Sequence, residues 1–125
     1  MRLASAFLAA IVLFLAAPPV ARADEPAWSA LAAGGHILFL RHAATDAGIG
    51  DPPEFRLGDC STQRNLSADG RAQARAFGER LAARGIAIGS VLSSRWCRCL
   101  DTARLAFGRV ETWAALDSFF GDRTT

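Results

Sequence analysis

Residues 36–42 read HILFLRH, and this stretch decides the fold. A continuous apolar run, 37–40, follows a glycine pair and ends at Arg41 and His42. A run of this kind is typical of a strand that is buried on both faces of a parallel sheet. We therefore expect residues 36–40 to form a central strand with Arg41 and His42 at its carboxyl end.

The residues that follow carry the signals of alternating helices and strands. Ser67 is a helix N-cap, apolar side chains recur after it at helical spacing, and Gly85 ends the pattern. A short amphipathic segment over 24–33 precedes the first strand. After that strand the sequence predicts, in order, a loop over 43–65, a helix over 67–85, a strand centred on 90–92, a helix over 96–107 and a strand over 110–113. This order predicts an α/β fold in which a parallel sheet is flanked by helices.

The ends of two predicted strands bring basic side chains together. Arg41 and His42 follow the first strand, and Arg98 lies in the segment after the second. Ligands bind beyond the carboxyl ends of the strands in such sheets. A neutral histidine is a competent nucleophile toward phosphorus, and guanidinium groups bind phosphate oxygens through fork-like donors. Taken alone, an Arg-His pair is more often a strand end that pairs with acidic side chains.

Three longer motifs contain or follow this pair. Residues 38–45 read LFLRHAAT, residues 65–74 read NLSADGRAQA, and residues 91–103 read VLSSRWCRCLDTA. In this order they resemble the Arg-His-Gly signature, the Leu-Ser/Thr-x-x-Gly-x-x-Gln-Ala helix start and the Ser-Ser-x-x-x-Arg-Ala-x-x-Thr-Ala segment of the histidine phosphatase superfamily. The resemblance covers about residues 36–121 and implies a phosphoglycerate mutase-like, three-layer α/β fold.

The resemblance implies roles for the positions that match. His42 takes the phosphoryl group as a phosphohistidine, and Arg41 and Arg98 bind the phosphate oxygens. Thr45 lies where the family often places a small hydroxyl residue near that pocket. The family's proton donor is commonly a Glu, and Ser118 stands at the position that aligns with it, so the neighbouring Asp117 is the candidate general acid, with a turn cap as its alternative role. No metal and no organic cofactor is implied, because the arginines supply the charge stabilisation.

Two features depart from the family pattern. Ala43 replaces the glycine of the signature. The family's second catalytic histidine follows a later strand, and no residue of this sequence takes its place. His36 cannot replace it, because six residues of strand put it roughly 20 Å from His42. We therefore expect a chain that is truncated and a sheet that is incomplete at the C-terminus.

The first 23 residues have the features of a signal peptide. A positive region at Arg2 precedes an apolar run over 3–17, and residues 21–23 (ARA) offer a small-x-small site for cleavage after Ala23. A retained anchor is the alternative, but an apolar helix of 15 residues spans only about 23 Å of a roughly 30 Å hydrocarbon core. We therefore expect a histidine phosphatase domain over 24–125, periplasmic or secreted, with no stable membrane anchor after cleavage.

The charge of the mature chain excludes one class of partner. The full sequence carries 14 Arg, no Lys and 12 acidic residues, for a net charge of +2. Removal of residues 1–23 takes two arginines away and leaves 12 Arg against 12 acidic residues. Binding to a nucleic-acid backbone needs clustered positive charge, so a nucleic-acid partner is not expected. The expected partner is a small phosphorylated substrate or inorganic phosphate.

Three cysteines, Cys60, Cys97 and Cys99, suit an exported chain with one disulfide. Cys97 and Cys99 are two residues apart and cannot easily pair with each other. We expect one of them to pair with Cys60, which leaves one free thiol. A zinc site built from the three cysteines and His36 is the alternative, but the spacing matches no standard ligand pair. No metal is therefore expected.

Together these features predict a phosphatase that hydrolyses phosphomonoesters through a phosphohistidine on His42. Because the second catalytic histidine is absent, we expect this chain to be weakly active or inactive. The alternative is a non-catalytic remnant of the same fold, in which Arg41, His42 and Arg98 bind phosphate or a partner without turnover.

Overall fold

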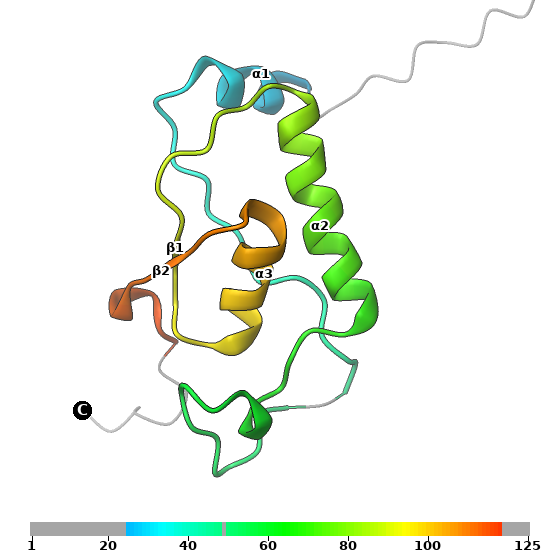
Figure 1. Ribbon diagram of the computed structural model, residues 1–125, viewed down its shortest axis with the longest axis vertical. Helices are drawn as coiled ribbons and strands as arrows, with labels where there is room; N and C mark the ends of the chain where they lie inside the picture. The colour runs from blue at the N-terminus through cyan, green and yellow to red at the C-terminus, as the bar shows by residue number, and fades with distance from the viewer. Residues whose placement is uncertain (1–24, 49, 119–125) are drawn as a thin grey trace, which may run out of the picture.

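The computed structural model describes residues 25–48 and 50–118. These residues form, in chain order, α1 (Glu25–Ala33), the short 3₁₀ helix η1 (Cys60–Thr62), α2 (Ala68–Ala83), β1 (Leu92–Ser93), α3 (Cys97–Phe107), β2 (Glu111–Thr112) and the 3₁₀ helix η2 (Ala114–Leu116). Figure 1 shows α3 in the middle of the molecule, with α2 along one side of it and the two strands on the other.

The predicted signal peptide, residues 1–23, lies outside the described residues. Within the described part of the chain, no helix is long and apolar enough to cross a membrane.

α2 begins and ends at the signals that the sequence provides. The Ser67 hydroxyl oxygen accepts a hydrogen bond from the Gly70 N–H at 3.0 Å, which satisfies a donor of the first turn. At the other end Gly85 takes the left-handed conformation (φ 66°), and the N–H groups of Gly85 and Ile86 donate to carbonyls of the last turn. Both predicted helices are confirmed, because the bounds of α2 and α3 lie within two residues of the expected ones.

α2 and α3 pack closely because Gly78 of α2 has no side chain where it faces Ala106 of α3. A Cβ on Gly78 would meet the carbonyl oxygen of Ala106 at 1.9 Å, so a larger residue would push the helices apart. The rings of Phe77 and Phe107 meet edge to face beside this contact, with centroids 6.3 Å apart. Leu105 of α3 packs on a small buried cluster that consists of Ala43, Leu66 and Ala74.

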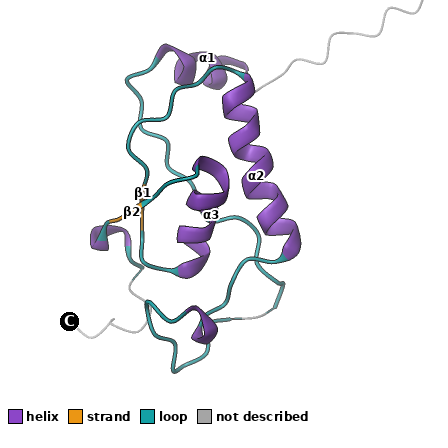
Figure 2. Cartoon of the chain, viewed as in Figure 1, coloured by secondary structure: helices purple, strands orange, loops and turns teal. Residues whose placement is uncertain are grey.

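The sheet of the described residues consists of the parallel strands β1 and β2, which are orange in Figure 2. Leu92 is in register with Glu111, and Ser93 with Thr112. The Glu111 N–H donates to the Val91 carbonyl at 2.9 Å. Because α3 connects the two strands, this part of the chain is a β-α-β unit, which agrees with the predicted α/β class.

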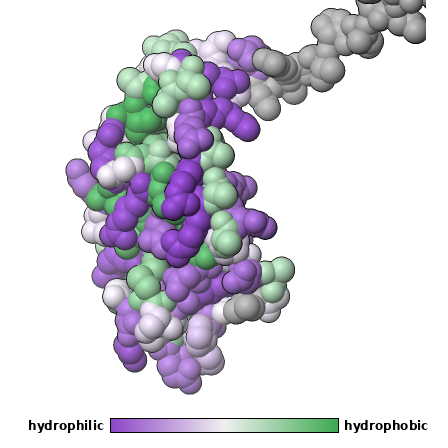
Figure 3. All heavy atoms as spheres, turned by 45° about the vertical axis from the view of Figure 1, so that its right-hand side comes forward, coloured by the Kyte–Doolittle hydropathy of each residue, from purple (hydrophilic) through white to green (hydrophobic). Residues whose placement is uncertain are grey.

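The prediction of a buried central strand over residues 36–40 is wrong. These residues belong to no strand, and Figure 2 draws them as loop. Ile37 and Phe39 are 82% and 80% exposed, and Figure 3 shows strongly hydrophobic residues at the surface in the upper half of the molecule. An apolar run is buried in a parallel sheet only where neighbouring strands bond to it and helices cover it. No backbone hydrogen bond joins 36–40 to another segment of the described chain.

Candidate active site

The backbone that follows His42 is fixed by both long helices. The Ala43 N–H donates to Oγ1 of Thr102 in α3 at 3.0 Å, and the Ala44 N–H donates to Oε1 of Gln73 in α2 at 2.9 Å. Thr102 and Gln73 belong to the two later sequence motifs. These motifs therefore act on the site by holding the backbone beside His42.

The start of α2 lies against the same backbone. The Ser67 N–H donates to the carbonyl oxygen of Ala44 at 3.1 Å. A Cβ on Gly70 would lie 1.9 Å from that oxygen, so the contact requires a glycine. Thr45, a predicted substrate-binding residue, forms an isolated antiparallel bridge with Leu66 and is partly buried. The glycine of the helix-start motif thus has a packing role here.

His42 has a defined ring orientation. Its Nδ1 lies 2.7 Å from the carbonyl oxygen of Ala43. A carbonyl oxygen can only accept, so Nδ1 donates its proton there and Nε2 of the neutral ring keeps its lone pair. Burial lowers the pKa of His42, the Ala43 carbonyl opposes this shift, and the positive charges of Arg98, Arg41 and Arg64 lower the pKa further. The lowered pKa favours the neutral ring, in which Nε2 carries a free lone pair.

Arg64 is a third arginine near His42, and the sequence patterns did not single it out. Its charge acts on the His42 ring together with those of Arg41 and Arg98. Arg64 directly precedes the motif over 65–74, and a basic residue next to a site motif was the only signal for it in the sequence. We use the name basic cluster for Arg41, Arg64 and Arg98.

Arg98 lies in the first turn of α3 and is only 3% exposed. Its Cζ lies 4.3 Å from the centroid of the Trp96 ring, and its Nη1 donates to Oδ1 of Asp51 at 2.9 Å. Its Nε is buried and has no hydrogen-bond partner among the described residues. A buried guanidinium with an unused donor is suited to bind an anionic oxygen of a ligand.

A disulfide joins Cys60 to Cys97, with Cα atoms 5.6 Å apart, and Cys99 is a free thiol. Of the two pairings that the sequence left open, the structure thus contains the one with Cys97. The bond removes two thiolates from the zinc alternative. In the ranges 25–48 and 50–118, no group of three or more His, Cys, Asp or Glu side chains is placed to hold a metal ion.

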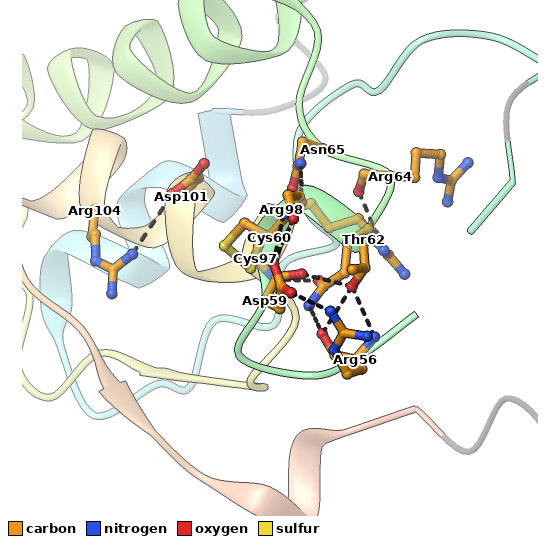
Figure 4. Close-up of a disulfide and its surroundings, with 12 residues drawn as sticks. Arg56, Asp59, Cys60, Thr62, Arg64, Asn65, Cys97, Arg98, Asp101 and Arg104 are labelled. Atoms are coloured by element: carbon orange, nitrogen blue, oxygen red, sulfur yellow. Dashed lines mark hydrogen bonds and ion pairs between the residues drawn. A yellow bond between two sulfur atoms is a disulfide. The ribbon is translucent and has the colours of Figure 1, made fainter. Parts of the chain in front are cut away.

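The disulfide ties the loop before α2 to the residue next to Arg98. The Cys97 N–H also donates to Oε1 of Gln63 at 2.9 Å, so two links fix the same point. Figure 4 shows Arg98 beside the disulfide, with Arg64 close by. A bridge between residues 37 positions apart stabilises the fold by about 4 kcal/mol in the loop-entropy description.

Asp117, the candidate general acid, is held by Arg95. Its Oδ1 accepts the Arg95 N–H at 2.7 Å, and its Oδ2 lies 2.7 Å from Nε and 2.6 Å from Nη2 of Arg95. Burial raises the pKa of Asp117, but the N–H and the guanidinium of Arg95 outweigh it and hold this pKa below its usual range. An ionised carboxylate in an ion pair is poorly suited to donate a proton at neutral pH.

Comparison with known proteins identifies the family of the chain. The sequence model of the histidine phosphatase superfamily (branch 1) matches residues 37–122. No curated protein and no solved structure matches the chain. The family match covers more than half of the chain and includes His42, the basic cluster and Asp117. The chain therefore belongs to the histidine phosphatase superfamily.

Proposed function

We propose that this chain is a phosphatase that hydrolyses phosphomonoesters through a phosphohistidine on Nε2 of His42. The observation that carries the proposal is the orientation of the His42 ring, whose Nδ1 bonds to the Ala43 carbonyl while three arginines act on the neutral ring. Membership of the superfamily supports phosphatase- or mutase-type chemistry on a phosphorylated substrate.

In the first step, the Nε2 lone pair of His42 attacks the phosphorus of the ester. The N–P bond forms while the P–O bond to the alcohol breaks, and the leaving oxygen takes a proton from water. Arg41 and Arg98 bind the phosphoryl oxygens, and Arg64 adds a third positive charge. Fixed positive donors of this kind stabilise the charge of the transition state. Thr45 contributes a hydroxyl at the edge of the same site.

In the second step, water attacks the phosphorus of the phosphohistidine. The N–P bond breaks, its electron pair returns to Nε2, and inorganic phosphate leaves. The sequence holds one other histidine, His36, which is exposed and whose Nδ1 bonds to the Gly34 carbonyl at 2.8 Å. We therefore propose no role for His36 in either step.

We give Asp117 a supporting role in place of the proton donor that the family resemblance suggested. Its carboxylate bonds to both the backbone and the guanidinium of Arg95. This arrangement fixes the Arg95 side chain. The proton for the leaving alcohol then comes from water.

We also propose that the protein is exported, with cleavage after Ala23, and that it acts in the periplasm or outside the cell. The apolar run in residues 1–23 and the Cys60–Cys97 disulfide support this location, because disulfides persist in oxidising compartments. The partner that fits the basic cluster is a small phosphorylated substrate or inorganic phosphate.

A second candidate function is phosphate binding without turnover. It is favoured by the buried guanidinium of Arg98, because its Nε has no hydrogen-bond partner among the described residues and an anion can bind such a group without being hydrolysed. The two candidates differ in one observable, the formation of a phosphohistidine.

The test compares the purified protein with His42→Ala and with the matched control His36→Ala, using para-nitrophenyl phosphate as substrate. We expect hydrolysis by the protein and by His36→Ala, and a loss of about 10²-fold or more in His42→Ala, because the nucleophile is removed. Acid-labile, base-stable incorporation of phosphate should disappear in His42→Ala only. Equal turnover by His42→Ala would contradict the proposal, and binding of phosphate without turnover would select the second candidate.

A further inference from the structure

The carboxylate of Asp51 lies inside the basic cluster, and the reaction steps above do not use it. Its Oδ1 accepts hydrogen bonds from Nη1 of Arg98 and from the backbone N–H of Arg64, both at 2.9 Å. The Asp51 side chain is 15% exposed and that of Arg98 is 4% exposed. One carboxylate oxygen thus joins two arginines of the cluster.

This contact occupies one donor group of Arg98. Asp51 takes Nη1, and the Trp96 ring lies against the guanidinium. The buried Nε is left without a hydrogen-bond partner among the residues that the structure describes. A buried guanidinium is unfavourable unless an acidic group pairs with it, so Asp51 also allows Arg98 to remain inside the protein.

Asp51 also sets the charge of the cluster. Arg41, Arg64 and Arg98 carry three positive charges that act on His42, and Asp51 bonds to two of these residues with one negative charge. Asp51 therefore offsets part of the positive charge beside Arg98. A phosphate or phosphomonoester is a dianion above its second pKa, which is about 6 for a phosphate group, so Asp51 repels it by its charge.

We propose that Asp51 is the positioning residue of the phosphate site, which orients Arg98 through Nη1 and offsets part of the positive charge of the basic cluster. This inference rests on the proposed function, because it takes the basic cluster to be the phosphate site. The negative charge of Asp51 repels phosphate and so weakens its binding. The bond from Asp51 to Arg98 orients the guanidinium and so strengthens phosphate binding. It favours dianions over more highly charged anions and promotes product release.

Two substitutions separate the charge of Asp51 from its geometry. Asp51→Asn keeps an oxygen that can accept from Arg98 and Arg64, but it removes the negative charge. Asp51→Ala removes the acceptor as well, so Arg98 loses its bond and the loop loses its link to α3. We therefore expect the two variants to change phosphate affinity in opposite directions.

Asp59→Asn is the matched control. Asp59 lies on the same loop, pairs with Arg56 at 2.6 Å and caps η1 through Ser61. Its substitution changes the net charge of the protein by the same amount as Asp51→Asn does, and asparagine is an equally good N-cap. It removes no contact of the basic cluster, so it measures the effect of net charge alone.

The measurement is a calorimetric titration of the four folded proteins with inorganic phosphate and with pyrophosphate at pH 8 and low salt. We expect Asp51→Asn to bind phosphate about threefold to tenfold more tightly, because one nearby negative charge is gone. Its gain for pyrophosphate should be larger, since that anion carries more charge. Asp51→Ala should bind phosphate more weakly than the unmodified protein, and Asp59→Asn should agree with the unmodified protein within about twofold.

Phosphate binding by Asp51→Asn that is no tighter than that of the unmodified protein would overturn the inference. So would equal affinities of Asp51→Asn and Asp51→Ala, or no phosphate binding by any of the four proteins. The proposed function is judged separately by turnover that depends on His42. A protein that hydrolyses para-nitrophenyl phosphate but is indifferent to Asp51→Asn refutes this inference alone.

Discussion

The residues before Arg41 and the residues after His42 adjoin the same site, but they are held very differently. Residues 36–40 expose their apolar side chains and bond to no other segment of the described backbone. Residues 43–45 bond to Thr102 of α3, to Gln73 of α2 and to the backbone around the α2 N-cap. The comparison teaches that the helices, and not the sheet, fix the backbone beside His42 in this chain.

The largest effect on stability is expected from a larger side chain at Gly70, where α2 contacts the backbone after His42. In Gly70→Ala the new Cβ would meet the Ala44 carbonyl oxygen at 1.9 Å, and neither backbone can give way easily. We expect a loss of about 3 kcal/mol in the free energy of unfolding. Urea denaturation measures it. The control is Gly89→Ala, whose Cβ meets nothing within 4 Å. Equal stability of the two variants would show that α2 does not contact the backbone of Ala44 closely.

A smaller effect on stability is expected from removing a contact of the backbone after His42, and almost none from a substitution in the run before Arg41. Thr102→Val removes the acceptor of the Ala43 N–H and should cost about 1 to 2 kcal/mol in the free energy of unfolding. Phe39→Ser changes a side chain that is 80% exposed, so its cost should stay below about 0.5 kcal/mol. Thermal or urea denaturation checks both. If Phe39→Ser instead cost about 3 kcal/mol or more, the run 36–40 would be buried after all.

The smallest effect concerns the His42 ring itself. Burial and the basic cluster lower its pKa below 6.5 in the folded protein, so the fold favours the neutral ring. The stability that this preference contributes is present above pH 6.5 and is lost as the pH falls through the lower pKa of the folded state. His42→Gln should flatten this part of the pH dependence, and His36→Gln should not.

Nitrogen NMR of the His42 ring measures directly which ring nitrogen carries the proton and at what pH the ring titrates. It should show His42 protonated on Nδ1 and titrating below 6.5. A His42 that titrates above 6.5, or that carries its proton on Nε2, would contradict the assignment of Nε2 as nucleophile.

The two long helices could be predicted from local sequence. Ser67 and Gly85 bound α2, and Gly108 ends α3 with a positive φ of 70°, because caps and glycines act within one turn. The family motifs pointed to His42 and Arg98 in the same way. The strand over 36–40 could not be decided locally, since burial of an apolar run depends on neighbours that lie elsewhere in the chain.

The sequence by itself determined the two long helices, the glycines that let them pack, the candidate nucleophile His42 and the presence of one disulfide partner for Cys60. Only the tertiary structure decided that this partner is Cys97, that Arg64 joins the basic cluster, and that Asp117 pairs with Arg95. It alone revealed Asp51, which meets Arg98 across 47 positions of sequence. Periodicity and capping are set by residues a few positions apart, whereas ion pairs and disulfides depend on how distant segments pack.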